Sequence, residues 1–556
     1  MPSKILAACF LLIVFISALL RLPQLDSVPA GLNWDETAYA YNAYSLWLTG
    51  ADEWGVQHPF LLRSFGENKP ALLSYLLIPF FSVFGATTHT ARLVAALLGI
   101  IGVASTFGIV YRLKKSIGTA TLTALLLAIT PWHLYHSRAL MDPILGHGLL
   151  LLGYYVWLKP GRVFHIVGAG ILALSMYAYN AERVFVPLFI AVSTFIQYRA
   201  NFKGELKQRW LGHLVFFCLA LFITAQTMFG SAGDRSRIVS VFSPSFIQNQ
   251  QSENQQMIEE SKLPLPGWNN QPVLVAIRVI AKNYAQHFRP DFLFFPGGNL
   301  ANLSFSKYGN LLSMMLPFFL VGLVSAIRHP NKSNSIFLTW LLLSPIPASL
   351  TQDVPHAGRA LLMLPALNYF TAIGIEHIVE WRDSWAWQWI SSLSIGLGVS
   401  YSAILFLIAF WTYFPQDTYH GFQGYNPELA RVVHSLQAQY NHVFLTNSYD
   451  FHSLLFFAWY TKMDPQLIQQ GERDYITLVK AGSVSLITDR MPVACALQQP
   501  NALVVLTPSQ AELLTTPALE MISFSPQKQA PPGFLLFDTN QLSFEDQDFA
   551  RKNCQY

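Results

Sequence analysis

The sequence predicts a multi-span α-helical membrane protein with a small α/β domain at its C-terminal end. Of its 556 residues, 52% are hydrophobic and only 12% are charged, and the mean hydropathy is +0.34. A soluble globular protein has about 25% charged residues. A chain so poor in polar residues cannot cover its surface with them, so lipid must cover much of it. The formal net charge of +4 is small, and no basic block points to nucleic acid.

Apolar runs recur along the first three quarters of the chain. A membrane-spanning helix needs ~20 mostly apolar residues, with ~17 as a lower bound, and about eleven runs meet or approach this length. The runs are Ile5–Leu20, Ala91–Tyr111, Thr119–Tyr135, Pro143–Leu158, Val163–Tyr179, Val184–Gln197, Trp210–Phe229, Leu311–Ile327, Ile336–Leu350, Ala360–Ile378 and Ile390–Phe414. We therefore expect about eleven spans.

Basic residues set the expected topology through the positive-inside rule. The apolar run Leu72–Phe84 is too short to span, and we expect it to form a juxtamembrane or re-entrant helix on the outer side. Basic clusters then fall in the cytoplasmic loops: Arg112, Lys114, Lys115, Lys159, Arg162, Arg199, Lys203, Lys207, Arg209, Arg328 and Lys332. This predicts a multi-pass plasma-membrane protein with a cytoplasmic N-terminus and a C-terminal region outside.

Three long non-spanning stretches share the expected outer face. We expect residues 1–414 to form a membrane domain whose outer loops are residues 21–90 and 231–310. Residues 415–556 form a separate extracytoplasmic domain, where apolar strands alternate with helical stretches such as Ser453–Thr461. The expected strands are Val443–Thr446, Val484–Thr488, Leu503–Leu506 and Phe534–Phe537. Cys495 and Cys554 lie in this tail; the sequence leaves open whether they pair.

Charged residues gather at the outer ends of the expected spans, and charges near a membrane are usually functional. The first group is Asn33-Trp34-Asp35-Glu36. Two adjacent acids in an aromatic, apolar context suit a general base or a metal ligand. The alternative is structural: Asp35 also fits the N-cap of a helix from Thr37 to Leu48.

The second group, Glu67-Asn68-Lys69-Pro70, opens the helix expected at Leu72–Phe84. Pro70 suits the first turn of that helix. Lys69 has the charge to pair with a lipid phosphate; a solvated lysine that extends to the membrane surface is the alternative.

Further groups lie at other outer span ends. Arg138 and Asp142 are four residues apart, so on a helix they would share a face, although a surface ion pair would stabilise little. The remaining outer-face candidates are Glu182, Arg183, His356 and Arg359. A transporter would bury such groups near the midplane, whereas these form a rim on one side. The rim favours an enzyme that acts on lipid-linked substrates.

The candidates fall within a series of short motifs. These are Trp34-Asp35-Glu36, Asn68-Lys69-Pro70-Ala71-Leu72, Phe84-Gly85, Ala91-Arg92-Leu93, Ser137-Arg138 with Asp142-Pro143, His287-Phe288-Arg289-Pro290 with Phe292-Leu293-Phe294, and His356 to Arg359 before Pro365. In order and placement they resemble the GT-C membrane glycosyltransferases, in particular the branch of protein O-mannosyltransferases and lipid A aminoarabinose transferases. Residues 415–556 match only in kind, because many relatives carry a variable extracytoplasmic C-terminal domain.

The resemblance implies an inverting transferase whose donor is a sugar on a polyprenyl phosphate, with a protein, lipid or cell-envelope glycan as acceptor. Asp35 would be the general base, with Glu36 beside it to orient it. Lys69 would contact the donor phosphate, with Arg138 and Arg359 as further phosphate partners. Asp142 would be the second acidic position. Short loops and the lack of a eukaryotic retention signal favour a bacterial plasma membrane.

Two departures weaken the likeness to the aminoarabinose transferases. Those proteins commonly have an acid before the lysine, where this chain has Asn68, and an arginine where it has Ala38. No cofactor is certain; a loosely held divalent metal ion stays open. The other function classes are a flippase or transporter of lipid-linked sugars and a noncatalytic envelope-assembly protein.

Overall fold

The structure is a computed structural model that describes residues 2–199, 202–229, 240–261, 270–296, 305, 307–447, 453–474, 477–523 and 532–554. Its contacts divide the chain into two compact units. The first, here called the helical unit, comprises Met1–Pro23 and Ala95–Trp411; the second, called the α/β unit, comprises Gln24–Val94 and Thr412–Tyr556.

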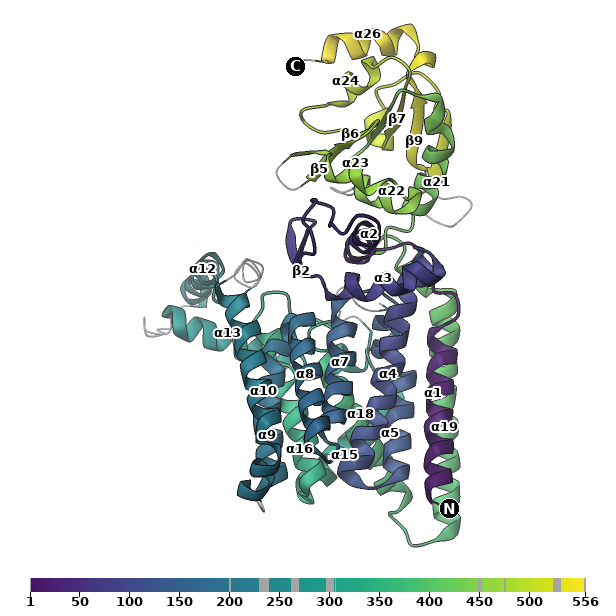
Figure 1. Ribbon diagram of the computed structural model, residues 1–556. Coiled ribbons are helices and arrows are strands. Elements are labelled where there is room, and N and C mark those ends of the chain that lie inside the picture. Colours follow the sequence, from purple (N-terminus) through teal and green to yellow (C-terminus); the bar gives the residue numbers. More distant parts are fainter. Residues whose placement is uncertain are drawn as a thin grey trace. The chain divides into compact units, whose positions relative to one another are not determined.

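The helical unit is a bundle of helices that run side by side (Figure 1). Its helices are α1 (Pro2–Arg21), most of α4 (Thr88–Lys114), α5 (Ile117–Ile129), α6 (Pro131–His136), α7 (Asp142–Trp157), α8 (Arg162–Ala178), α9 (Asn180–Tyr198), α10 (Phe202–Phe229), η3 (Ser313–Met315), α15 (Leu316–Arg328), α16 (Lys332–Leu343), α17 (Ile346–Ser349), η4 (Leu361–Met363), α18 (Leu364–Val379) and α19 (Trp385–Thr412). Each expected span coincides with one or two of these helices.

Local sequence explains where the helices break and how closely they pack. The span expected over 119–135 is divided into α5 and α6, because Pro131 lacks the N–H that would continue the hydrogen-bonded turn. Helices α15 and α18 cross with their backbones in close approach. A Cβ added at Gly322 would lie 1.8 Å from the Phe370 carbonyl oxygen, so only glycine fits there.

Five helices of the described chain are long and apolar enough to cross a membrane. They are Lys4–Arg21, Thr88–Lys114, Leu206–Gln226, Leu361–Val379 and Trp385–Thr412. Shorter apolar helices, such as Ile117–Ile129 and Arg162–Ala178, pack among them. The chain is therefore a membrane protein, while the number of about eleven spans stays a prediction.

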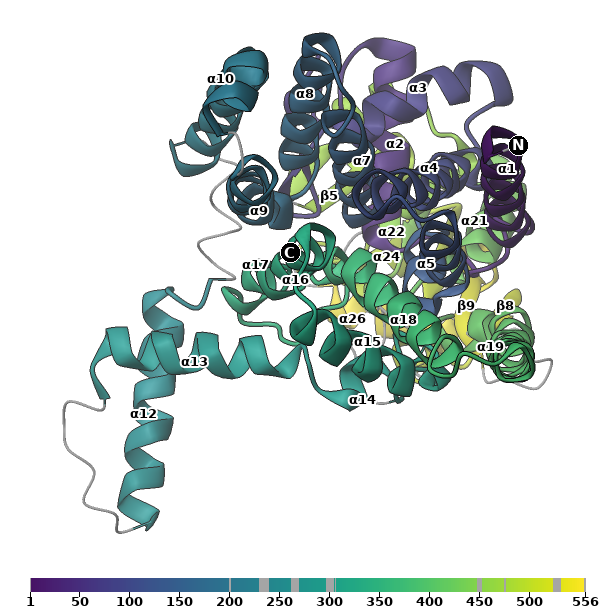
Figure 2. The ribbon, with the colours of Figure 1, turned by 90° about the horizontal axis from the view of Figure 1, so that it is seen from below.

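The described part of the expected outer loop 231–310 is mostly helical. It contains α12 (Pro244–Ser261), α13 (Pro272–Gln286) and α14 (Pro290–Leu293). Figure 2 shows α12 and α13 extending away from the bundle of the helical unit. Residues 231–239, at the start of this loop, lie outside the described residues.

The α/β unit contains the tail and also the first loop of the chain. The first loop forms α2 (Trp34–Thr49), β1 (Leu61–Ser64), β2 (Glu67–Pro70) and α3 (Leu72–Phe84). The tail forms α20 (Phe414–Asp417), α21 (Asn426–Leu436), η5 (Gln437–Gln439), β3 (His442–Leu445), α22 (Ser453–Thr461), α23 (Pro465–Gln469), β4 (Glu472–Asp474), β5 (Thr477–Ala481), β6 (Val484–Leu486), α24 (Val493–Gln498), β7 (Ala502–Leu506), α25 (Pro508–Ala511), β8 (Glu520–Ser523), β9 (Pro532–Asp538), η6 (Thr539–Gln541) and α26 (Phe544–Asn553). The predicted sheet region at the C-terminal end is confirmed.

The tail strands form one sheet in the order β4-β5-β6-β3-β7-β9-β8. Strand β3 runs parallel to both β6 and β7, and the other pairs are antiparallel. Helix α22 packs against β5 and β6, while α24 packs against β7 and α26. Figure 1 shows α22 and α23 on one side of the sheet and α24 and α26 on the other.

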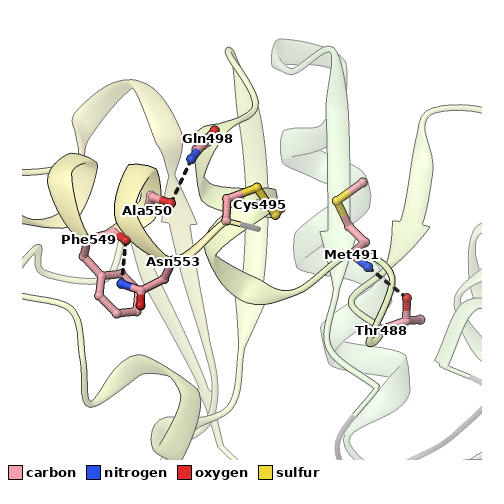
Figure 3. The surroundings of a disulfide bond; sticks show 8 residues. Thr488, Met491, Cys495, Gln498, Phe549, Ala550 and Asn553 are labelled. Atoms are coloured by element: carbon pink, nitrogen blue, oxygen red, sulfur yellow. Dashed lines mark hydrogen bonds between the residues drawn. A yellow bond between two sulfur atoms is a disulfide. The ribbon is translucent and has the colours of Figure 1, made fainter. Parts of the chain in front are cut away.

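A disulfide bond joins Cys495 to Cys554, the pairing that the sequence left open (Figure 3). It ties α24 to the end of α26, and the neighbouring apolar core includes Phe444, Val504 and Phe537. Disulfides form and persist in oxidising compartments.

The first loop packs against the tail. The Leu32 N–H donates to the Tyr460 hydroxyl at 3.0 Å, and the Tyr41 hydroxyl donates to the Met463 carbonyl at 3.2 Å. The sequence placed residues 21–90 in the same domain as the spans; in the structure, residues 24–94 group with residues 412–556 instead.

Candidate functional site

Helix α2 positions the first pair of candidate acids. It begins at Trp34 rather than at Thr37, and its N-cap is Asn33 rather than Asp35. The Glu36 N–H donates to Asn33 Oδ1 at 2.9 Å, and the Asn33 N–H donates to Glu36 Oε2 at 3.2 Å, which forms a capping box. Asp35 therefore lies in the first helical turn with its side chain not used as the cap.

Glu36 is held in a buried ion pair with Arg92. Arg92 Nε donates to Glu36 Oε1 at 2.8 Å and Nη2 donates to Oε2 at 2.9 Å, and neither side chain is exposed. The same guanidinium donates to the backbone carbonyls of Leu25, Pro29 and Gly31. A planar guanidinium with five donors suits such bidentate pairing. Glu36 thus anchors the start of α2, and its side chain is not exposed to a substrate.

A β-hairpin positions Lys69. Strands β1 and β2 are joined by Phe65 and Gly66, both with positive φ, as a two-residue hairpin turn requires. Alternation along β2 places Glu67 and Lys69 on one side. Pro70 ends this strand and does not lie in a helix first turn as expected; α3 begins at Leu72, the predicted boundary.

Lys69 forms ion pairs with two carboxylates. Its Nζ contacts Asp35 Oδ1 and lies 3.2 Å from Glu67 Oε2. The lysine side chain is only 3% exposed, whereas Asp35 is 26% and Glu67 36% exposed. The Lys69 ammonium is thus enclosed by protein, whereas the two carboxylates that it contacts are partly exposed to solvent. The structure brings Asp35, Lys69 and Glu67 together from α2 and β2.

The remaining candidates lie in the helical unit. Residues 137–141 are not helical and α7 begins at Asp142, so Arg138 and Asp142 do not share a helix face; that expectation was wrong. Arg138 is fully buried and donates to the carbonyls of Leu20, Arg21 and Pro23. These bonds make Arg138 a structural tie within this unit.

Asp142, Glu182 and Arg183 are neighbours in the helical unit. Arg183 interacts electrostatically with both acids. Glu182 is buried against α7, where its Oε1 lies 2.7 Å from the position a Cβ of Gly146 would take. Asp142 and the adjacent residues Glu182 and Arg183, which belong to two separate motifs of the sequence, therefore form one cluster of ionisable groups.

The loop before α18 carries His356 and Arg359. The Arg359 N–H donates to His356 Nδ1 at 3.2 Å, and Arg359 Nη1 donates to Thr351 Oγ1 at 2.9 Å. Burial lowers the pKa of His356, and the Arg359 charge acts in the same direction. The His356 N–H also points to His287 Nε2, at 3.5 Å. The motifs that contain His287 and His356, both part of the resemblance, thus lie next to each other.

Another buried carboxylate, Glu53, connects the first loop to the tail. Its Oε2 accepts from Ser64 Oγ at 3.2 Å and from Asn42 Nδ2 at 3.3 Å, while its carbonyl accepts from Arg473 Nη2 at 2.6 Å. The Arg473 guanidinium also stacks on the Trp54 ring at 3.9 Å. Burial raises the pKa of Glu53 to about 7, which the charge of Arg473 partly opposes. Nothing in the sequence motifs marked Glu53 or Arg473.

The acids of the first loop do not suit a metal ion. Glu36 is neutralised by Arg92, and both Asp35 and Glu67 contact Lys69. Across the described residues, no group of three or more His, Cys, Asp or Glu has the arrangement to hold a metal. A cation at Asp35 would compete with the Lys69 ammonium, so we assign no step to a metal.

Residues 8–164 match the family of dolichyl-phosphate-mannose-protein mannosyltransferases. ArnT from Cupriavidus metallidurans is similar in its apo structure, at 11% identity and a TM-score of 0.51, over 97% of this chain and 98% of ArnT. The family model covers less than half of the chain, and the fold is similar to that of solved GT-C membrane glycosyltransferases. ArnT bound to undecaprenyl phosphate matches at 12% identity and a TM-score of 0.50, again over 97% and 98% of the two chains.

A second solved structure is similar to this chain over a smaller share of its own length. The archaeal oligosaccharyltransferase AglB from Archaeoglobus fulgidus, in complex with an inhibitory peptide and a dolichol-phosphate, matches at 12% identity and a TM-score of 0.52. The match covers 83% of this chain but 64% of AglB, less than two thirds of it. No curated protein matches the chain by sequence. At these identities the solved structures show the shared GT-C fold.

Arg92→Met should unfold the first loop. It leaves the Glu36 carboxylate buried without its partner, a change that costs about 3–5 kcal/mol. Pulse proteolysis of the full-length protein in urea, with cleavage monitored within residues 24–94, measures the effect. Arg431→Met is the matched control, because its ion pair with Glu428 on α21 is exposed and contributes little. Equal urea midpoints for the two variants would show that the Glu36–Arg92 pair does not hold the loop.

Glu53 should make the α/β unit less stable as pH rises. Its folded pKa of about 7 lies above the ordinary 4.5, so the folded state binds more protons between these values. The free energy of unfolding therefore falls from pH 4.5 to 7, by roughly 3 kcal/mol, and is level above. Urea titrations at several pH values should show a flatter profile for Glu53→Gln than for the control Glu472→Gln, which alters an exposed pair with Lys480. Identical profiles for the two variants would show that Glu53 does not cause the pH dependence of stability.

Proposed function

We propose that this GT-C enzyme transfers a sugar, with inversion, from a polyprenyl-phosphate donor to an acceptor hydroxyl at the outer face of the membrane. The observation that carries the proposal is the contact of the enclosed Lys69 ammonium with the partly exposed Asp35 carboxylate. It supports the proposal that a phosphate partner lies beside a general base. The dolichol-phosphate and undecaprenyl phosphate in the related structures support a lipid-linked donor.

The reaction needs one base and one cation. The acceptor oxygen forms a bond to the anomeric carbon while the bond from that carbon to the phosphate oxygen breaks. The acceptor proton passes to Asp35, since a hydroxyl is a poor nucleophile until a positioned base removes its proton. The polyprenyl phosphate leaves with the electron pair of the broken bond, and Lys69 stabilises its developing charge.

The resting ion pair gives the donor a role in activating the base. An ammonium in contact with a carboxylate favours the charged form and makes that carboxylate a weaker base. A bound phosphate competes for Lys69, and Asp35 then recovers its basicity. Glu67 contacts the same ammonium at 3.2 Å, so Lys69 stays paired during the exchange.

Two separate places in the helical unit contain the other proposed groups. Asp142, beside Glu182 and Arg183, is the proposed second acidic position, and Arg359 is the second proposed phosphate partner. His356 holds Arg359 by accepting its backbone N–H at 3.2 Å. Arg138 has three backbone carbonyls as acceptors, so we no longer propose it as a phosphate ligand.

The proposed location is the outer face of a bacterial plasma membrane, with the N-terminus in the cytoplasm. The Cys495–Cys554 disulfide supports an extracytoplasmic tail, because cytosolic thiols are kept reduced. The acceptor is a hydroxyl on protein, lipid or cell-envelope glycan. A flippase or a noncatalytic assembly protein would not depend on Asp35.

Asp35→Asn should lower the rate of sugar transfer by about 10²–10⁴-fold, the usual contribution of a positioned general base. The assay uses purified protein in liposomes with polyprenyl-phosphate-linked mannose, glucose, galactose and arabinose, and an envelope extract as acceptor. Lys69→Ala should lower turnover by about 10²–10³-fold through loss of charge stabilisation. Asp548→Asn is the matched control, since this acid is partly exposed on α26 beside Lys552.

Loss of turnover in both site variants, with urea midpoints unchanged, supports the proposed roles. Full turnover in Asp35→Asn would contradict the base assignment and direct the same test to Asp142. If wild-type protein consumes none of the donors, the proposed donor class is wrong.

A further inference from the structure

The tail has a cavity that the proposed reaction does not use. It has a volume of about 610 Å³, within the ~300–1,000 Å³ of small-molecule sites. The described residues that line it are Asn447, Asp474, Thr477, Val479, Ile487, Thr488, Asp489, Pro492, Val493 and Gln510. All belong to the α/β unit.

The cavity lies where the sheet topology favours a ligand. Strands β3, β6 and β7 are parallel and end at Leu445, Leu486 and Leu506, and the cavity is lined by residues that follow each of these ends. The chain leaves β3, forms β6 on one side of it, and then forms β7 on the other. Ligands of open α/β sheets bind at such a reversal of strand order, outside the carboxyl ends.

The lining favours a neutral ligand with many hydroxyl groups. It combines two carboxylates, two threonine hydroxyls and two amides, which together accept from and donate to hydroxyls. No Lys or Arg is among these lining residues. Asp474 is paired with Arg490 at 3.2 Å, and the Asp489 carboxylate would repel an anion. Val479, Ile487 and Val493 offer apolar surface for the C–H face of a sugar ring.

The network around Gln510 fixes the orientation of its amide. Its Oε1 accepts from the Thr507 N–H at 3.0 Å and from Thr446 Oγ1 at 2.8 Å. Because a backbone N–H only donates, the oxygen must face it, and the amide nitrogen is the group that remains to donate to a ligand. Gln510 is thus a prearranged hydrogen-bond donor at the cavity.

The opposite wall is also held in place. The Met491 N–H donates to Thr488 Oγ1 at 3.2 Å (Figure 3). It also donates to the Thr488 carbonyl at 3.0 Å. Pro492 and Val493 then lead into α24, which the Cys495–Cys554 disulfide joins to the end of α26. A site with preordered walls loses less conformational entropy when it binds.

We propose that this cavity binds a neutral glycan. The inference stands on the cavity alone and does not require transfer at Asp35. A glycan site on the tail of a sugar transferase would hold a glycosylated acceptor or detect the product. Binding and turnover are therefore separate measurements.

The test is saturation-transfer NMR on full-length protein in nanodiscs, with mannobiose, maltotriose and chitobiose as neutral probes. Glucuronic acid and Ca²⁺ probe the anionic and cationic alternatives. At least one neutral probe should bind, and Asp489→Asn should weaken it about tenfold, the loss of one hydrogen bond to a charged group. Val479→Phe, which fills the cavity, should abolish binding. Glu512→Gln, an exposed acid that does not line the cavity, should leave it unchanged.

Binding that persists in Asp35→Asn protein would show that the site is independent of the reaction. The proposal fails if no neutral probe binds, if binding is equal in wild type, Asp489→Asn and Val479→Phe, or if only glucuronic acid or Ca²⁺ binds. Urea midpoints that match wild type show that each variant is folded, and a variant that fails this check is replaced by Thr477→Val.

Discussion

The buried pair of Glu36 and Arg92 is the constraint on which the first loop depends. Two charges without any exposure are tolerated only when every donor and acceptor is satisfied. Here the carboxylate accepts both guanidinium donors and the Asn33 N–H, while Arg92 also binds carbonyls at Leu25, Pro29 and Gly31. The start of α2 is therefore fixed to the preceding chain. Asp35, one residue before Glu36, is thereby held in the first turn of α2.

The α/β unit joins the C-terminal tail to the loop that contains the proposed site. Residues 24–94 and 412–556 form one compact body, joined by contacts such as Leu32 to Tyr460 and Glu53 to Arg473. A change in the tail can therefore alter the loop that carries Asp35 and Lys69. The tail is in this sense a support for the proposed site, whatever it binds in its own cavity.

Sequence patterns predicted the elements that depend on local chemistry. The bounds of α3 and α22 match the apolar runs, and the four expected strands appear as β3, β6, β7 and β9. Strands β4, β5 and β8 were missed because their sequences mix polar and apolar residues. They form through antiparallel pairing, β4 with β5 and β8 with β9. The cap at Asn33 was missed because Asp35 has an equally suitable side chain. Arg138 and Asp142 were misjudged because spacing alone does not reveal that residues 137–141 leave the helix. Arg92 lies in the Ala91-Arg92-Leu93 motif, but only the tertiary structure shows that it pairs with Glu36.

In the proposed reaction, a donor phosphate takes Lys69 from Asp35. An electron cryomicroscopy structure of the protein in nanodiscs with undecaprenyl phosphate tests it directly. We expect phosphate density in hydrogen-bond contact with Lys69 Nζ and an Asp35 carboxylate that has lost its contact with that ammonium. A phosphate bound elsewhere, with Lys69 still on Asp35 and Glu67, would contradict it.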